Sequence, residues 1–376
     1  MEIAERRRLP SDRAMWQDVT RALSEALGRH EVPCVRGRGR AFVAPISGDC
    51  LGGAHAGGDG VRVIVLGGTW FVGRAIVAAL RAAGHTPLVV HRGRAEPADL
   101  ADVEHLHAER QSWPAHRDTL AAFEPGAAID VSAENGAGAR AALDALPSGI
   151  RLIALSSVDV YRAYEGMLAR QLTDAVPLTE ASALRTVRHV EGPHWENLEL
   201  EERYLAAGAM VLRLGAVYGE HDYQRRFEPV LRRIRGGRTV LPVGAGNFLF
   251  SRVYVGDVAR AVLAAVTSDH RRHGCFNIVE TQTAPMGLFY AQIIAAAGAD
   301  LELVRVSDEV LPADLRASAA VGQHLLASGQ KARDVLGWRD SDPQEALRRS
   351  VQWHRANPPK DWDADFSGDD VALRTL

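Results

Sequence analysis

A glycine-rich turn, Gly67-Gly68-Thr69-Trp70-Phe71-Val72-Gly73, stands between an apolar run and a segment with helical spacing. Glycines there allow a tight reversal of the chain and a close approach of another molecule to the backbone. The start of the following helix presents unpaired N–H groups and a partial positive charge. The turn is therefore predicted to hold the pyrophosphate of a dinucleotide. The alternative is a strand-to-helix turn that binds nothing.

The residues after the next apolar run indicate which dinucleotide is preferred. Sites for NAD usually place an acidic residue there, bonded to the ribose 2′-hydroxyl, whereas this chain has His91-Arg92-Gly93-Arg94. No carboxylate would repel a 2′-phosphate, and a guanidinium is well shaped to bind one. NADP is therefore favoured, NAD being the alternative, with Arg92 as the first candidate ligand and Arg94 and His91 behind it. Glu109, after the third predicted strand, is a further candidate near the adenine, and solvated loop charges are the alternative for the arginines.

Alternating strands and helices must position these residues. Short apolar runs typical of buried parallel strands cover 61–66, 86–90, 103–107, 127–131, 151–155 and 210–214. Helical patterns intervene, as in the apolar spacing after Val72 and the Ala-rich segment 137–146. This alternation predicts an α/β fold, a Rossmann-type doubly wound parallel sheet, with a smaller mixed C-terminal lobe.

The expected organisation follows from these patterns. Residues 1–60 form a largely flexible N-terminal extension, 61–227 the dinucleotide-binding domain, 228–358 a substrate lobe that can share part of the sheet, and 359–376 a tail. The extension contains Arg36-Gly37-Arg38-Gly39-Arg40, which could contact RNA, although a solvated linker is the preferred interpretation.

Composition narrows the classes of protein. The net charge is −3 over 376 residues, so no global field favours nucleic acid or an anionic membrane. The three cysteines are far apart in the sequence, which predicts neither a disulfide framework nor a zinc site. No apolar run is long enough for a membrane span, and no signal-peptide core is visible. The expectation is a soluble cytoplasmic protein without a metal.

Taken together, the motifs from residue 61 to about 358 resemble the extended short-chain dehydrogenase/reductase superfamily, in its NAD-dependent epimerase/dehydratase group. The turn is similar to that of the atypical branch, which includes isoflavone-reductase-like and chloroplast stem-loop-binding proteins; Trp70 stands where the commonest form has glycine. The later matching motifs, in order, are Ser156-Ser157-Val158-Asp159-Val160-Tyr161, Leu212-Arg213-Leu214-Gly215-Ala216-Val217-Tyr218-Gly219 and Val255-Gly256-Asp257-Val258-Ala259.

The resemblance implies a Ser-Tyr-Lys mechanism, in which a lysine four residues after a tyrosine lowers the tyrosine's pKa for proton transfer. Ser157 occupies the serine position. The chain has only two lysines, Lys331 and Lys360, and alanine stands four residues before each. By alignment the tyrosine position holds Pro193 or His194, and the lysine position Asn197 or Leu198.

Other groups are candidates for the missing acid and base. His194 can titrate near neutral pH, and Tyr161 is the second candidate. Asp159, Arg213 and Tyr218 are expected to contact substrate, although each has a structural alternative. A metal site at His189, Glu191 and His194 is disfavoured because their spacing fits no strong ligand pattern.

Three functions are open at this point. The preferred one is an NAD(P)-dependent reductase, dehydrogenase or epimerase acting on a hydroxyl or carbonyl carbon of a small molecule, such as a sugar derivative or secondary metabolite. The others are a catalytically silent dinucleotide-binding regulator and, less favoured, an RNA-associated protein. A homodimer is implied by analogy with the family alone.

Overall fold

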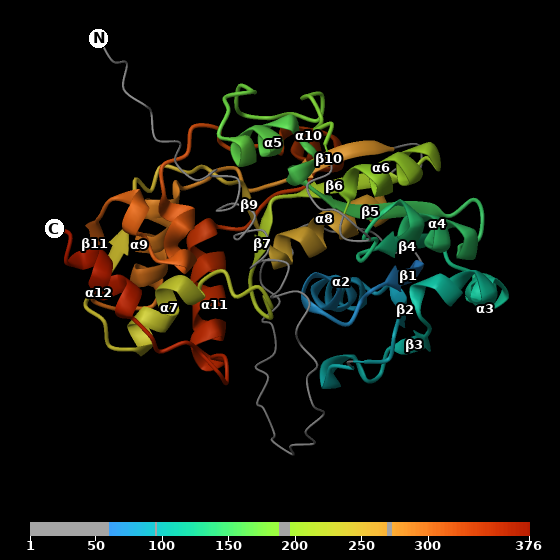
Figure 1. Ribbon diagram of the computed structural model, residues 1–376. Helices are drawn as coiled ribbons and strands as arrows, with labels where there is room; N and C mark the ends of the chain where they lie inside the picture. The colour runs from blue at the N-terminus through green and yellow to red at the C-terminus, as the bar shows by residue number, and fades with distance from the viewer. Residues whose placement is uncertain (1–59, 95, 188–195, 269–272) are drawn as a thin grey trace, which may run out of the picture. The chain divides into compact units, whose positions relative to one another are not determined.

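The computed structural model describes residues 60–94, 96–187, 196–268 and 273–376 (Figure 1). Residues 1–59 of the N-terminal extension, which the sequence analysis expected to be flexible, and with them the segment Arg36–Arg40, therefore lie outside the described residues.

A parallel seven-stranded sheet organises the described chain, in the order β10-β6-β5-β4-β1-β2-β3. The apolar runs predicted as strands are all present, and their order confirms the doubly wound Rossmann-type sheet. The strands are β1 (Arg62–Leu66), β2 (Thr86–His91), β3 (Glu104–His107), β4 (Ala127–Asp130), β5 (Arg151–Ser157), β6 (Met210–Leu214) and β10 (Gly274–Ile278).

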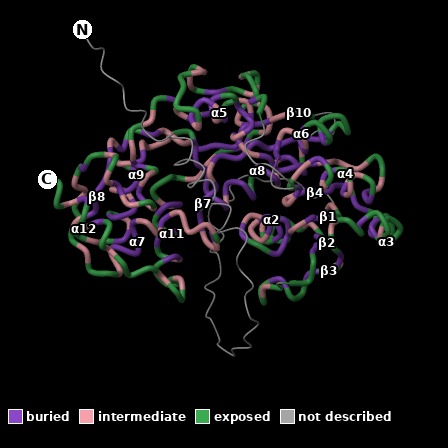
Figure 2. Tube along the Cα trace, in the orientation of Figure 1, coloured by how far each residue is buried: buried purple, intermediate pink, exposed green. Residues whose placement is uncertain are grey.

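Helices cover both faces of this sheet, as its nearly continuous apolar strands require. In β1, Val63 and Val65 belong to one core cluster, and Ile64 and Leu66 to the other, because successive side chains of a strand point to opposite faces. The buried residues accordingly follow the strands and the inner sides of the helices (Figure 2). One face carries α2 (Phe71–Ala82) and α8 (Val255–Thr267), and the other α3 (Arg117–Ala122), α4 (Gly136–Ala145) and α6 (Asn197–Ala206).

The C-terminal part is mixed, as predicted, and contains two small parallel ladders. Strand β7 (Ala216–Tyr218) pairs with β9 (Arg252–Tyr254), and β8 (Val240–Val243) pairs with β11 (Glu302–Arg305). The other helices are α5 (Arg162–Ala169), α7 (Glu228–Arg235), α9 (Met286–Ala296), α10 (Gln330–Leu336), α11 (Pro343–Ala356) and α12 (Ser367–Leu373). Short 3-10 helices are η1 (Ala98–Leu100), η2 (Arg110–His116), η3 (Val158–Val160), η4 (Asp308–Val310) and η5 (Ala313–Ser318).

Two features lie C-terminal to residue 227, and the first is the sharing of the sheet that the sequence analysis allowed for. Strand β10 follows residue 227 yet completes the sheet beside β6, so the sheet is shared by both parts. The segment expected as a tail contains α12, whose buried Asp369 forms an ion pair with the equally buried Arg233. None of the described helices is long and apolar enough to cross a membrane.

Candidate functional site

The glycine turn is packed so closely against its neighbours that its glycines leave no room for side chains. Gly67 has φ +92°, a conformation that L residues rarely adopt, and a Cβ on Gly73 would lie 2.3 Å from the carbonyl oxygen of Gly67. Helix α2 therefore starts in direct contact with the turn. Its N-cap, Trp70, provides no side-chain cap and its first turn contains no acidic residue, so its opening N–H groups suit a diphosphate.

A partly buried network that the sequence analysis missed lies next to the turn. Arg110 donates to both carboxylate oxygens of Asp130, each at 2.8 Å, and to Ser132 Oγ at 2.7 Å. Tyr204 also donates to Asp130, and a Cβ on Gly67 would collide with Ser132. A carboxylate at the end of a buried strand, Asp130 of β4, was the signal in the sequence that could have indicated this network. Its partners Arg110 and Tyr204 come from η2 and α6, which the sequence does not place next to it.

Trp70, which replaces the usual glycine, lies beside the start of α2 rather than in the core. Trp70 is 59% exposed, and its ring stacks on that of Tyr223, with ring centroids 5.1 Å apart. Tyr223 also contacts Phe71 edge-on. Trp70, in place of glycine, therefore connects the turn through Tyr223 to the chain segment that follows β7.

The residues at the end of β2 differ in what they offer a cofactor. Arg92 and Arg94 are exposed; Arg94 lies 3.4 Å from Glu109, while Arg92 has no ion pair with any other described residue. His91 is buried, and burial, with neighbouring His105 and His107, lowers its pKa to about 4. Arg92 is thus the better placed of these residues to meet a phosphate, and His91 is neutral near pH 7.

A pocket of about 160 Å³ opens at the carboxyl ends of β4, β5 and β6. Ser157 ends β5, and its Oγ accepts a hydrogen bond from the Asp159 amide at 3.2 Å. The lining is mostly apolar and includes the second residue of α2: Val72, Val131, Leu155, Ser156, Ser157, Asn197 and Leu214.

Asn197 lines this pocket together with Ser157. Its side-chain amide donates to Asp159, at 2.9 Å to Oδ1 and 3.0 Å to Oδ2. The preceding Glu196 caps α6 and forms a buried bidentate ion pair with Arg185, at 3.0 and 2.6 Å, which fixes the start of the helix. Of the two residues aligned with the family's lysine, Asn197 lines the pocket and Leu198 does not.

The remaining candidates around the family's tyrosine position, His189, Glu191, Pro193 and His194, lie outside the described residues.

Tyr161 lies in the interior. Its hydroxyl donates to Asn277 Oδ1 at 2.6 Å and accepts from Arg213 at 3.1 Å. Burial raises the pKa of Tyr161 to about 12, against the opposing effect of Arg213. This environment disfavours Tyr161 as a proton donor or acceptor near neutral pH.

Arg213 and Tyr218, expected to contact substrate, have buried partners instead. Arg213 makes a bidentate ion pair with Glu201, at 2.7 Å for its shortest bond, and Glu201 also accepts from Ser156. Tyr218 donates to Glu280. Both side chains are at most 3% exposed, so the geometry favours structural roles for them. Asp159 is the one of the three that stands beside the pocket.

The fold and this site together are typical of a dinucleotide-binding α/β protein with a small pocket at the carboxyl edge of its sheet. The chain belongs to the NAD-dependent epimerase/dehydratase family, whose model matches residues 63–278.

The chain is similar to proteins of low sequence identity and different activities. A chloroplast stem-loop binding protein of 41 kDa from Arabidopsis thaliana is 25% identical over 330 residues, which are 83% of this chain and 84% of the relative. A 2′-dehydrokanamycin reductase from Streptomyces kanamyceticus is 27% identical, over 67% of this chain and 71% of the relative.

Solved structures show the same fold. A dTDP-glucose 4,6-dehydratase from Bacillus anthracis, in complex with NAD, has a TM-score of 0.63 at 17% identity, covering 79% of this chain and 97% of its own. A UDP-glucose 4-epimerase from Thermotoga maritima, with UDP-glucose, has a TM-score of 0.61 at 18% identity, covering 79% and 100%.

Proposed function

We propose that this protein is an NADP(H)-dependent oxidoreductase or epimerase that acts on a carbonyl or hydroxyl carbon of a small molecule. The observation that carries the proposal is the placement of Ser157 and Asn197 in an apolar pocket that Val72 of α2 also lines. A pocket so close to the glycine turn suits the reacting end of a bound dinucleotide, next to its substrate.

The chain offers fitting residues for each part of the cofactor. The turn from Gly67 to Gly73 and the start of α2 would hold the pyrophosphate, because the opening N–H groups of α2 have no side-chain cap and no acidic neighbour in the first turn. Arg92, with Arg94 and Glu109 nearby, would meet the adenosine end. The nicotinamide, when bound, supplies or accepts a hydride.

Ser157 is the group proposed to bind the reacting oxygen. Its Oγ already accepts the Asp159 amide, and its own proton is not donated to any other described residue. A hydrogen bond from this hydroxyl to a substrate carbonyl would stabilise the negative charge that develops on that oxygen as hydride adds.

Proton transfer then needs a group other than a tyrosine–lysine pair. His194 is the proposed acid/base, since it precedes the pocket-lining Asn197 by three residues in the sequence. Asp159, held by Asn197, orients this edge of the pocket and is proposed to contact the substrate.

The test compares two serine variants at opposite ends of β5. Ser157→Ala removes the pocket hydroxyl, and Ser148→Ala alters an exposed serine before the strand. NADPH and NADH binding is measured by fluorescence titration, and NADPH oxidation is followed with a panel of sugar-derived and aromatic carbonyl compounds. We expect both variants to bind NADPH, and only Ser157→Ala to lose turnover, on the order of 100-fold.

Three results would count against this function. Equal turnover in the two variants would remove Ser157 from the chemistry. Binding of NADPH without turnover of any compound, in the wild type and in His194→Gln alike, would favour the catalytically silent regulator. Failure of both dinucleotides to bind at millimolar concentration would contradict both the enzyme and the dinucleotide-binding regulator.

A second candidate, RNA association, is favoured by the similarity to the Arabidopsis stem-loop binding protein and by the Arg36–Arg40 segment. The net charge of −3 argues against it. Retention of structured RNA by the full chain, lost when residues 1–60 are deleted, would support this candidate.

A further inference from the structure

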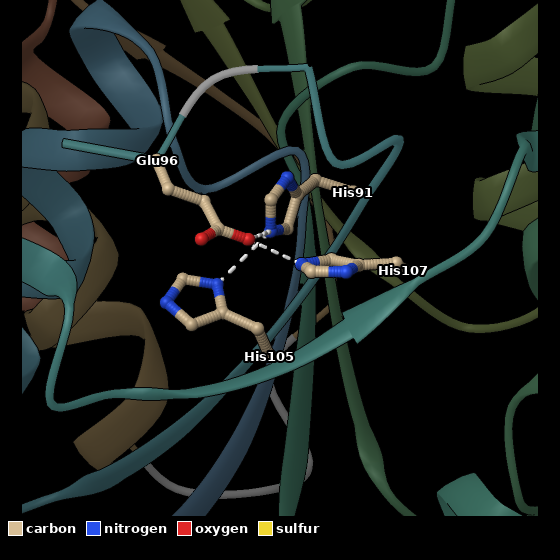
Figure 3. Close-up of side chains that lie close together, drawn as sticks. All are labelled: His91, Glu96, His105 and His107. Carbon is tan, nitrogen blue, oxygen red and sulfur yellow. Dashed lines mark hydrogen bonds and ion pairs between the residues drawn. The ribbon is translucent and has the colours of Figure 1, made fainter. Parts of the chain in front are cut away.

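Three histidines and a glutamate meet at one edge of the sheet, away from the Ser157 pocket. His91 ends β2, His105 and His107 lie on the edge strand β3, and Glu96 belongs to the connection between them. One possible ligand atom from each residue lies within 4.8 Å of all the others. Figure 3 shows the four side chains pointing toward one another.

The strand register explains why the histidines converge. His91 and His107 are direct partners in the parallel β2–β3 ladder, so their side chains project from the same face of the sheet. His105 lies two residues before His107, and residues i and i+2 of a strand share a face. A His-x-His pair on an edge strand therefore meets a histidine at the end of the neighbouring strand.

Hydrogen bonds outside the cluster orient two of its ligands. His105 Nε2 lies 2.9 Å from the carbonyl oxygen of Leu100, which can only accept, so Nε2 carries the proton. The unprotonated Nδ1 of His105 then faces His91 Nε2, at 3.0 Å. Glu96 Oε1 forms an ion pair with His107 Nε2 and lies 3.7 Å from His91 Nε2.

We propose that His91, Glu96, His105 and His107 bind one divalent transition-metal ion of the zinc type. Three imidazole nitrogens and one carboxylate oxygen are a ligand set that Zn²⁺ accepts, whereas Mg²⁺ and Ca²⁺ prefer oxygen alone. Ligands about 2.0–2.1 Å from a tetrahedral ion stand roughly 3.3 Å apart. The separations of 3.0 and 3.7 Å between the ligand atoms of His91 and its neighbours bracket that value. The bond from His105 to Leu100 is the kind of outer contact that fixes the tautomer of a metal-ligating histidine.

Metal binding requires the ligand atoms, now within 4.8 Å of one another, to adjust to tetrahedral spacing, and it changes one hydrogen bond of His91. Without metal, the Gly93 amide donates to Nδ1 of His91 at 3.2 Å, so the His91 proton sits on Nε2. Ligation through Nε2 moves this proton to Nδ1, and the Gly93 amide gives up its bond. Gly93 has φ +73° and is exposed, so this peptide can turn without disturbing a packed core.

The experiment titrates the full chain, prepared without a histidine tag and stripped with chelator, with Co²⁺ and then with Zn²⁺. Four-coordinate Co²⁺ absorbs in the visible region, and Zn²⁺ should abolish that absorption by displacement. We expect one equivalent of Co²⁺ to bind. The His105→Gln/His107→Gln double variant should lose the band. Glu96→Gln should bind at least about 10-fold more weakly, since the loss of even an outer contact of a ligand costs that much. The control His116→Gln, outside the cluster, should behave as wild type.

Two outcomes would overturn the proposal. No visible band with stoichiometric Co²⁺ would exclude the site, and an unchanged band in the double variant would place the metal on other histidines. Far-UV circular dichroism checks folding of each variant. If the double variant does not fold, Glu96→Gln decides alone, since Glu96 is 44% exposed on its side chain and its substitution leaves the strands intact; unchanged affinity there overturns the proposal.

Discussion

The side-chain amide of Asn197 donates to both carboxylate oxygens of Asp159, 38 residues earlier in the chain. The two residues come from the start of α6 and from η3, and Asn197 also lines the pocket beside Ser157. Asn197 is one of the two residues aligned with the family's lysine, and its side-chain amide fixes a carboxylate. We therefore propose that chemistry in the pocket is organised around Ser157, Asp159 and Asn197.

Asn197→Ala should reduce turnover with little effect on dinucleotide binding. Without the amide, Asp159 loses the contact that orients it, and a displaced group at a reacting centre costs on the order of 10–100-fold in rate. Steady-state kinetics should show the loss in kcat, with Glu202→Gln, an exposed change on the same helix, as the control. Asn197→Asp should also shift the pH profile upward, because two adjacent carboxylates raise the pKa of one of them; unaltered kcat in both variants would contradict the assignment.

Arg92→Ala should weaken NADPH binding by about 10–100-fold, the equivalent of one hydrogen-bonded charge contact, and leave NADH binding nearly unchanged. The selectivity follows because only NADPH carries the 2′-phosphate. Arg94→Ala is the matched control and should have a smaller effect, since Arg94 lies near Glu109. Parallel fluorescence titrations measure both affinities, and an equal loss for NADH and NADPH would show that Arg92 does not read the phosphate.

Asp369→Asn should destabilise the protein by about 2 kcal/mol, because it removes one of the two carboxylates that pair with buried Arg233, the other being Asp314. Asp369 accepts from Arg233 at 2.8 and 2.6 Å, and neither residue has measurable exposure. The neighbouring Asp370 pairs with Arg238, and both side chains are partly exposed, so Asp370→Asn should cost no more than about 1 kcal/mol. Urea unfolding of both variants measures the difference; similar free energies would mean that α12 is not anchored by Asp369.

Glu280 should make folding stability fall as the pH rises. Burial raises its pKa from an ordinary 4.5 to about 7, against the effects of the Tyr218 hydrogen bond and the Arg252 charge, while Asp257 and Asp340 add to the rise. Between these values the folded state keeps a proton that the unfolded chain releases. The contribution of protonated Glu280 to the free energy of unfolding is therefore fully present below pH 4.5 and is lost as the pH rises through about 7.

The Glu280→Gln variant isolates this contribution. From about pH 5 to about pH 8, wild type should lose on the order of 2–3 kcal/mol relative to the variant. The exposed change Glu302→Gln on β11 should follow wild type. Urea unfolding at both pH values measures the free energy of unfolding of each protein. The same pH dependence of this free energy in wild type and Glu280→Gln would contradict the raised pKa of Glu280.

The histidine cluster could be predicted from the sequence only in part. The sequence singles out His91, and the alternation of His105 and His107 is visible in it. The meeting of the three depends on β2 and β3 pairing in one register, His91 opposite His107. A shift of one residue would send His105 and His107 to the other face.

The sequence alone determined the sheet and the turn, because both depend on local rules: runs of apolar residues predict buried strands, and Gly67, Gly68 and Gly73 are spaced as the turn requires. Only the tertiary structure decided which polar residues face the pocket. Arg213 and Tyr218 lie in motifs that predict substrate contact, yet each meets a buried carboxylate, Glu201 or Glu280. A buried charge or hydroxyl needs a partner, and that partner stands on an element whose position in the sheet or lobe is set by long-range packing.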